Sequence, residues 1–298
     1  MTGVEGRAPQ TPPLVSVVIP CHDYARFLPQ CLESLLAQEL DPQALQVVFV
    51  DDGSSDGSLE AARTLLGQMP FGSWHSLGLA HVGRPGPVRN AGLVLAQGEH
   101  LLCLDPDDRL LPGFLPRCLE ALSRARADVA YTGYFEQRGK ELREVRPPDY
   151  SPLLLANQNI MLTTSLMRRS VYEGGARYRS ATAYEDWDFW VQAAALGATF
   201  VRVDGPQMVY RVHGQSYFHA ALEHDGESKA RIVVDNPAFF PPWTRAWARG
   251  LLRGEAWASP CGRGLIPVLR EHAGLDGLDR KGPGPSRHNQ LPCEPTHN

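Results

Sequence analysis

Short, uninterrupted apolar runs that end in polar turns are the most constraining feature of this 298-residue sequence. The clearest is 101–104 (Leu-Leu-Cys-Leu), which leads directly into Asp105-Pro106-Asp107-Asp108, and 46–50 leads into Asp51-Asp52-Gly53 in the same way. A run of this length without polar alternation is typical of a strand buried on both faces, as in a parallel sheet. Helical periodicity follows such runs, for example at 112–126. This alternation predicts an α/β fold, in which helices cover both faces of a mostly parallel sheet.

The same patterns predict an order of elements along the chain. Pro20 is expected to end the first strand. Gly and Pro residues at 83–92 indicate a loop, with a helix beginning near Pro87. The charged, proline-containing residues 140–150 are expected to form another loop. In full, strands are expected at 14–19, 46–50, 74–80, 101–104, 128–135, 163–167 and 199–203, and helices at 27–36, 58–66, from 87, 112–126 and 185–196.

Composition disfavours several classes of protein. The net charge of −4 and the pI near 6.2 give no support for a general nucleic-acid surface. No apolar run approaches the roughly 18 residues of a membrane span, and residues 1–13 lack the apolar stretch of a signal peptide. We therefore expect a cytoplasmic protein. Its cysteines lack paired spacing, so those in apolar runs are expected to be reduced and buried: Cys21, Cys31, Cys103 and Cys118.

The acidic turn after 101–104 allows two interpretations. Asp105 and Asp107 flank one residue, so both side chains could reach a single hard cation, at the edge of the sheet where ligands bind in open α/β folds. Asp-Pro-Asp is also ordinary turn chemistry. Arg89 is expected in the first turn of its helix, where a cation opposes the helix dipole. An arginine at that position indicates an anionic ligand.

Four motifs in chain order resemble those of family-2 glycosyltransferases with the GT-A fold. They are residues 15–20 (Val-Ser-Val-Val-Ile-Pro), 50–57 (Val-Asp-Asp-Gly-Ser-Ser-Asp-Gly), 89–92 (Arg-Asn-Ala-Gly) and 104–108 (Leu-Asp-Pro-Asp-Asp). The resemblance covers roughly 14–216. We therefore expect a GT-A domain at 14–218, after a disordered segment at 1–13. A helical extension at 219–280 and a disordered tail at 281–298 complete the expected organisation.

The resemblance implies a metal-dependent, inverting transfer of a sugar from a nucleotide-sugar donor to a hydroxyl acceptor, in polysaccharide or glycoconjugate synthesis. UDP is the expected nucleotide and Mn²⁺ or Mg²⁺ the expected cofactor. The acceptor class could be a glycan, a lipid-linked sugar, a protein or a small molecule. A divalent ion would neutralise the diphosphate leaving group as a Lewis acid.

The resemblance also implies roles for residues of the donor site. It places Asp107 on the metal, Asp105 at the ribose or the metal, and Arg89 against the diphosphate. Asp52 would accept from a ring N–H of the base. His22 would stack on the base, although it could instead cap the turn after the first strand. The nucleotide-binding set is Pro20, His22, Asp23, Asp52, Arg89 and Asp105.

Acidic and aromatic residues alternate at 184–190 (Tyr-Glu-Asp-Trp-Asp-Phe-Trp), where a helix is expected to begin. Acidic side chains at the start of a helix are stabilised by the helix dipole, and this alone could explain one or two of them. The resemblance implies that Asp186 is the general base and that Glu185 and Trp187 lie at the acceptor. A positioned base is worth roughly 10²- to 10⁴-fold in rate. Trp187 and Trp190 are three residues apart, so one of them is expected to pack into the core.

Two features of the remaining sequence bear on partners. In 210–213 (Tyr-Arg-Val-His), the resemblance places His213 on the metal or the phosphates, with Arg211 as an alternative phosphate contact. Residues 237–257 carry aromatic residues and arginines four apart, which is typical of a basic amphipathic helix. Such a helix could make peripheral contact with an anionic membrane. We favour packing of its aromatic side on the catalytic domain, with the arginines in water.

The sequence disfavours two other functions. A nucleotidyltransferase acting on sugar phosphates would need a Gly-rich, basic loop after the first strand, and residues 22–26 (His-Asp-Tyr-Ala-Arg) do not provide one. A non-catalytic nucleotide- or sugar-binding relative would be indicated by loss of Asp107 or Asp186, and both are present. An enzyme of the hexosyl- or N-acetylhexosaminyltransferase class is therefore expected.

Overall fold

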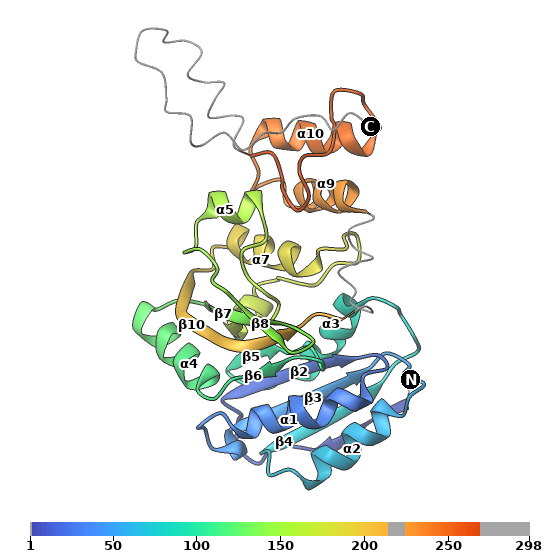
Figure 1. Ribbon diagram of the computed structural model, residues 1–298, viewed down its shortest axis with the longest axis vertical. Coiled ribbons are helices and arrows are strands. Elements are labelled where there is room, and N and C mark those ends of the chain that lie inside the picture. The colour runs from blue at the N-terminus through green and yellow to red at the C-terminus, as the bar shows by residue number, and fades with distance from the viewer. Residues whose placement is uncertain (1, 214–223, 269–298) are drawn as a thin grey trace.

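The computed structural model describes residues 2–213 and 224–268, which form a layered α/β structure around one ten-stranded sheet (Figure 1). The strand order is β1-β4-β3-β2-β5-β9-β7-β10-β6, with β8 paired to β7. The strands are β1 (Thr2–Arg7), β2 (Val15–Cys21), β3 (Leu45–Asp51), β4 (Ser73–Gly78), β5 (His100–Cys103), β6 (Arg109–Leu110), β7 (Val129–Arg138), β8 (Glu141–Val145), β9 (Leu166–Arg168) and β10 (Phe200–Arg211). The helices are α1 (Leu28–Leu36), α2 (Ser58–Gln68), α3 (Pro85–Leu95), α4 (Phe114–Ala125), α5 (Pro152–Asn157), α6 (Arg169–Glu173), α7 (Glu185–Ala195), α9 (Asp225–Asp235) and α10 (Pro242–Leu252).

The predicted α/β architecture is confirmed. Strands β4, β3, β2 and β5 run parallel, as expected for buried apolar runs joined by helices. Strand β9 then pairs antiparallel with both β5 and β7, and β10 runs parallel to β7. The carboxyl ends of β2, β3 and β5 therefore open onto the same edge of the sheet.

Each face of the sheet carries its own hydrophobic core. Successive strand side chains point to opposite faces, so Val18 and Cys103 pack with α3, α7, α9 and α10, whereas Val17 and Leu102 pack with α1, α2 and α4. Figure 1 shows α7, α9 and α10 stacked on one side of the sheet and α1 and α2 on the other. Gly92 lets α3 approach β2 closely, because a Cβ there would lie 2.4 Å from the Val18 side chain.

Two predicted boundaries differ in the part of the sheet that carries the site. Strand β2 continues through Pro20 to Cys21 instead of ending at Ile19. The Val18 carbonyl accepts from Leu104 beyond the end of β5, so Pro20, two residues on, faces the open side of β2 and costs no ladder bond. Helix α3 begins at Pro85 rather than Pro87, which places Arg89 beyond the first turn.

The N-terminal segment was predicted wrongly. Residues 1–13 were expected to be disordered, but β1 pairs antiparallel with β4 at the edge of the sheet. Its contacts are mostly polar: Arg63 Nε lies 2.9 Å from the Glu5 carboxylate, and the Arg7 guanidinium donates to the Phe71 carbonyl. Backbone pairing and these ion contacts hold β1, so no apolar pattern marks it in the sequence.

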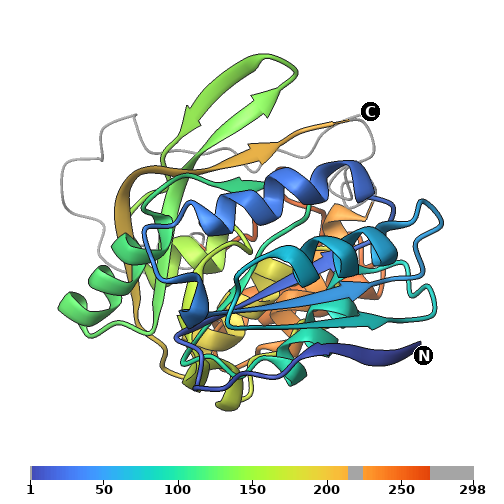
Figure 2. The same cartoon turned by 90° about the horizontal axis from the view of Figure 1, so that it is seen from below.

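Two further segments differ from expectation. Residues 140–150, expected to form a loop, contain β8, which pairs with the end of β7 in a hairpin that projects from the sheet in Figure 2. Strand β10 runs to Arg211 rather than ending at Val203, with two register shifts against β7. Strand β8 is exposed and mostly polar, so backbone pairing rather than burial defines it. The added part of β10 instead lies between β7 and β6 and buries Met208 and Val209.

Helices α9 and α10 form the described part of the region expected to be a C-terminal extension. Trp247 and Phe240 are buried in the same core as the sheet, while Arg249 and Arg253 are exposed. This is the packing favoured from the sequence for these two arginines, whereas Arg245 is half-buried and donates to the Pro237 carbonyl. The tail expected at 281–298 lies outside the described residues. Within 2–213 and 224–268, no helix combines the length and the apolar character needed to cross a bilayer.

Candidate active site

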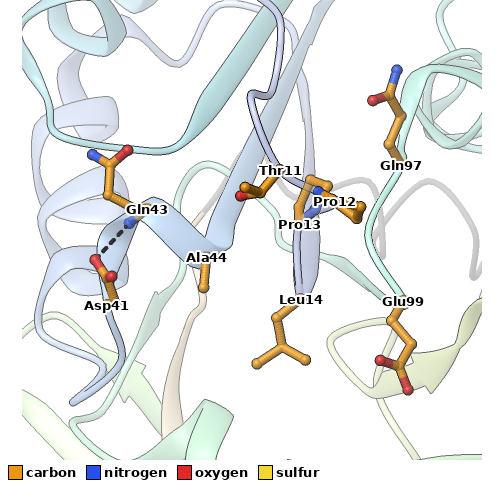
Figure 3. A pocket seen from close by; sticks show the side chains of 9 residues that line it. All are labelled: Thr11, Pro12, Pro13, Leu14, Asp41, Gln43, Ala44, Gln97 and Glu99. Atoms are coloured by element: carbon orange, nitrogen blue, oxygen red, sulfur yellow. Dashed lines mark hydrogen bonds between the residues drawn. The ribbon is translucent and has the colours of Figure 1, made fainter.

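The residues predicted from sequence lie at the carboxyl ends of β2, β3 and β5, at the start of α7 and at the end of β10, and Arg89 lies on α3. A separate hollow of about 440 Å³ lies at the opposite edge, where Leu14, Ala44, Gln97 and Glu99 line it (Figure 3). None of the predicted site residues lines that hollow. The site is therefore built from turns at the edge that binds ligands in open α/β sheets.

The turn after β2 is fastened to the turn after β3 by Asp23. This residue adopts a left-handed backbone (φ 58°), and its Oδ1 accepts from the Ser55 amide at 2.7 Å. In return its own amide donates to Ser54 Oγ at 2.9 Å. The Asp51 carboxylate accepts from the Ser54 amide at 3.0 Å within the same turn. Asp23 therefore holds the two turns together in this structure.

Two stacked imidazoles lie over Asp52. The ring centroids of His22 and His81 are 4.2 Å apart, and the Nδ1 atoms of both lie within 3.0 Å of the Asp52 carbonyl oxygen. The buried Asp52 carboxylate accepts from the amides of Val82 (2.6 Å) and Gly83 (2.9 Å). His22, Asp52 and His81 are also the described group whose ligand atoms could hold a metal ion. In this arrangement both Nδ1 atoms are engaged by the Asp52 carbonyl, and each carboxylate oxygen of Asp52 already accepts one backbone amide.

His81 was missed in the sequence reasoning. It follows β4, which lies beside β3 in the sheet, so it reaches the same edge as His22 and Asp52. The rule that parallel strands bring their carboxyl ends together would have placed it there. The signal was present at the end of 74–80, the weakest of the expected strands.

Arg89 is buried between two acidic groups. Its Nη2 lies 2.7 Å from Asp105 Oδ1 and its Nη1 lies 2.8 Å from Glu185 Oε1, while its Nε has no partner among the described residues. The predicted anionic partner of Arg89 is thus provided by the protein itself. The guanidinium links the end of β5 to the start of α7, and contact with a diphosphate stays a prediction.

Asp107 and His213 meet although 106 residues separate them. His213 Nε2 lies 2.8 Å from Asp107 Oδ2, and the imidazole packs beside the rings of Tyr24 and Phe27. Burial, followed by the charge of Asp105, raises the pKa of Asp107, whereas His213 lowers it. A carboxylate oxygen and an imidazole nitrogen at this separation fit two ligand positions on one divalent cation.

Asp108 and Arg211 connect the acidic turn to β10. Asp108 is buried, and its Oδ1 accepts from the Arg211 amide at 2.9 Å. The Arg211 guanidinium instead contacts the Gln30 side chain of α1 and lies 5.1 Å from the Phe27 ring centroid. The Arg211 backbone thus holds the end of β10, which leads to His213, against the acidic turn.

The two acids at the start of α7, Glu185 and Asp186, differ in burial. Glu185 is buried on Arg89, and burial raises its pKa to about 7, partly offset by Arg89. Asp186 keeps a partly accessible side chain that accepts from Asn159 Nδ2 at 2.9 Å. Burial also raises the pKa of Asp186. Of these two acids, Asp186 is the more accessible.

The predicted acceptor contact of Trp187 is wrong. Trp187 is 1% exposed, and its indole Nε1 donates to the Leu155 carbonyl at 2.6 Å. Trp190 is fully buried as well. Both rings face the core because α7 lies between the sheet and α9, so each side of the helix is covered.

Comparison with known proteins places this geometry in a family. The family model described as Glycosyl transferase family 2 matches residues 16–184, more than half of the chain. The glycosyltransferase GlyG of Streptococcus pneumoniae serotype 4 is 29% identical over 50% of this chain and 49% of its own length. The chain thus spans about half of that relative.

Solved structures agree on the architecture. S. aureus TarS 1-349 in complex with UDP-GlcNAc superposes with a TM-score of 0.63 at 17% identity, over 83% of this chain and 73% of that one. The mannosyltransferase PcManGT from Pyrobaculum calidifontis, in complex with GDP-Man and Mn²⁺, gives a TM-score of 0.60 at 18% identity. The match covers 92% of this chain and 83% of that one. The fold is the GT-A fold expected from the four motifs. The chain belongs to glycosyl transferase family 2.

Proposed function

We propose that this protein is a metal-dependent, inverting glycosyltransferase that moves a sugar from a UDP-sugar to a hydroxyl acceptor in polysaccharide or glycoconjugate synthesis. The single observation that carries the proposal is the convergence of the acidic turn after β5, His213 and the acid pair of α7 at one edge of the sheet. Family membership supports the reaction class. The separation of buried Glu185 from accessible Asp186 supports an assigned base.

The nucleotide would lie along the carboxyl ends of β2 and β3. His22 and its neighbour His81 offer a flat surface on which a base can stack, and imidazoles stack with less area than tyrosine. The Asp52 carboxylate would accept from a ring N–H in addition to its two backbone partners, since a carboxylate has about four lone-pair sites. TarS is bound to UDP-GlcNAc and PcManGT to GDP-Man, so the nucleotide is the first property to measure.

Asp107 and His213 would hold the divalent cation. When bound, a cation there supplies Lewis-acid neutralisation of the diphosphate leaving group. Asp105 lies two residues before Asp107, and its Oδ1 is held 2.7 Å from Arg89 Nη2. The chain's own contribution is to fix two ligand atoms 2.8 Å apart before the donor arrives.

Asp186 would accept the proton of the acceptor hydroxyl as the new bond forms. A carboxylate in this role must be ionised and reachable, and Asp186 meets the second condition where Glu185 does not. Attack from the side opposite the diphosphate inverts the anomeric carbon. Glu185 would act through Arg89 by keeping the guanidinium in place.

Calorimetric titration of the purified protein with UDP, GDP and dTDP, each with Mn²⁺ and with EDTA, tests the donor site. We expect UDP to bind only when Mn²⁺ is present. Asp107→Ala should abolish that metal-dependent binding, because it removes one of two ligand atoms. The control is Asp204→Asn, which changes an exposed acid paired with Arg202 and should bind as the wild type does. Unchanged affinity in Asp107→Ala would remove this residue from the metal site.

A further inference from the structure

Helix α9 holds the chain that leads into the acid pair of α7. Thr182 Oγ1 donates to the Ser228 carbonyl at 3.1 Å, and the Ala183 amide donates to Ser228 Oγ at 3.2 Å. Both contacts lie two or three residues before Glu185. A residue of α9 therefore fixes the backbone immediately before the acids.

The next contact involves the residue that precedes α7. The Tyr184 hydroxyl donates to Asp225 Oδ1 at 2.7 Å, and the Gly264 amide donates to the same oxygen. The other carboxylate oxygen, Oδ2, lies 2.5 Å from Lys229 Nζ. Lys229 is fully buried, and its ammonium group also donates to the carbonyls of Cys261 and Gly262. A buried ammonium is costly without partners, so these acceptors fix Lys229 and, through it, the Asp225 carboxylate.

A third contact follows the acid pair. Asn236 Nδ2, just beyond the end of α9, donates to Asp188 Oδ1 at 2.7 Å. Asp188 is 1% exposed and also accepts from Gln192 Nε2. The backbone carrying Glu185 and Asp186 is thus held on both sides, at 182–184 and at 188, by one helix from a distant part of the sequence.

We propose that α9 is a positioning element for Asp186, with Asp225 and Tyr184 as the positioning residues. The proposal rests on the proposed function, in which Asp186 is the base. Apart from the Asn159 contact at the surface, the Asp186 carboxylate bonds to the Trp187 amide of its own helix. The position of the Asp186 carboxylate is therefore set by the backbone of the first turn of α7, and α9 holds that backbone in place.

Tyr184→Phe tests this with little disturbance, because Asp225 keeps Lys229 and Gly264 as partners. The matched control is Tyr131→Phe, which removes a hydroxyl that donates to the Pro148 carbonyl at 2.8 Å. The activity probe is hydrolysis of UDP-GlcNAc, or of GDP-mannose if GDP is the nucleotide that binds. We expect Tyr184→Phe to lower kcat about 10-fold at unchanged KM and unchanged nucleotide Kd, since small misplacements of a catalytic group cost rates of this order. Tyr131→Phe should change kcat less than about twofold on the same reasoning.

Hydrogen exchange gives a readout that does not depend on activity. In Tyr184→Phe the amides of 185–188 should exchange faster than in the wild type, whereas Tyr131→Phe should leave them unchanged. Unchanged exchange at 185–188 would overturn the positioning role. Faster exchange with unchanged kcat would overturn its connection to catalysis.

Failure of the proposed function has a different signature. If the wild-type protein binds no nucleotide and hydrolyses neither donor, the base assignment fails and the catalytic part of this proposal fails with it. The exchange measurement would still decide whether α9 holds the start of α7.

Discussion

Among single residues, Glu185 carries the clearest electrostatic consequence. Its pKa is about 7, raised chiefly by burial and held down in part by Arg89. The folded protein therefore binds this proton more tightly than the unfolded chain, where the ordinary value is 4.5. By linkage, Glu185 makes the free energy of unfolding fall as the pH rises from about 4.5 to 7.

Glu185→Gln should remove that pH dependence, because the amide does not ionise. The altered contact with Arg89 adds an offset that does not depend on pH. Beyond that offset, the free energy of unfolding of the variant should rise by about 2 to 3 kcal/mol relative to the wild type between pH 4.5 and 7. Urea unfolding across this range measures the difference. Glu60→Gln, which changes an exposed acid of α2, is the control and should follow the wild type. Parallel stability curves for Glu185→Gln and wild type would contradict the assignment.

Asp186→Asn separates binding from chemistry at the neighbouring position. The amide keeps the shape of the side chain and loses the proton acceptor, so nucleotide affinity should stay unchanged while transfer falls at least about 100-fold. Calorimetry and donor hydrolysis on the same preparation check both halves. Asp128→Asn, which changes an acid bonded to Thr199 away from the site, should keep full activity. Full activity in Asp186→Asn would remove this residue from the mechanism.

Whether a site residue could be predicted depends on whether a local motif or the docking of distant helices positions it. The pairing of Asp107 with His213 was implied by the family resemblance, and the structure places their side chains in contact. The engagement of Arg89 by Glu185 was not predicted, since it depends on how α7 docks against α3. Trp187 was misassigned because the resemblance placed it beside the general base at the acceptor, whereas in the structure α9 covers the outer side of α7.

Among the elements, β1 shows most clearly what a hydrophobic pattern does not encode. Strands β2, β3 and β5 are buried on both faces and were predicted from their apolar runs. Strand β1 carries Gly3, Glu5 and Gly6 and exists because β4 offers it a free edge. Its presence follows from the sheet order, which short-range sequence patterns do not contain.

Gly6→Ala should detach β1 from β4. A Cβ at Gly6 would lie 2.0 Å from the Trp74 carbonyl oxygen, where the two strands pair. Hydrogen exchange of the β4 amides should become faster, and the stability should fall by about 1 to 2 kcal/mol. Gly3→Ala is the matched control, because a Cβ there meets nothing within 4 Å. Equal exchange in the two variants would indicate that β1 does not pair as described.

At the scale of the whole molecule, one core joins segments that the sequence suggested were separate. The resemblance ended near 216, and 219–280 was expected to be an extension. In the structure, Trp247 of α10, Ile232 of α9 and Trp190 of α7 share a core with Val18 of the central sheet. Residues far apart in the chain therefore contribute to the same buried volume, and the described parts should unfold together.

Trp247→Ala tests this cooperativity. Trp247 is 2% exposed and its indole donates to the Ser259 carbonyl, so truncation should cost about 3 to 5 kcal/mol. Because the core is shared, the loss should appear as one transition at lower denaturant, with tryptophan fluorescence and far-UV circular dichroism changing together. Trp257→Ala, which removes a ring that is 56% exposed, is the control and should shift the midpoint little. Two separate transitions in Trp247→Ala, with the sheet signal unmoved, would mean that α9 and α10 fold apart from the sheet and could not hold the start of α7.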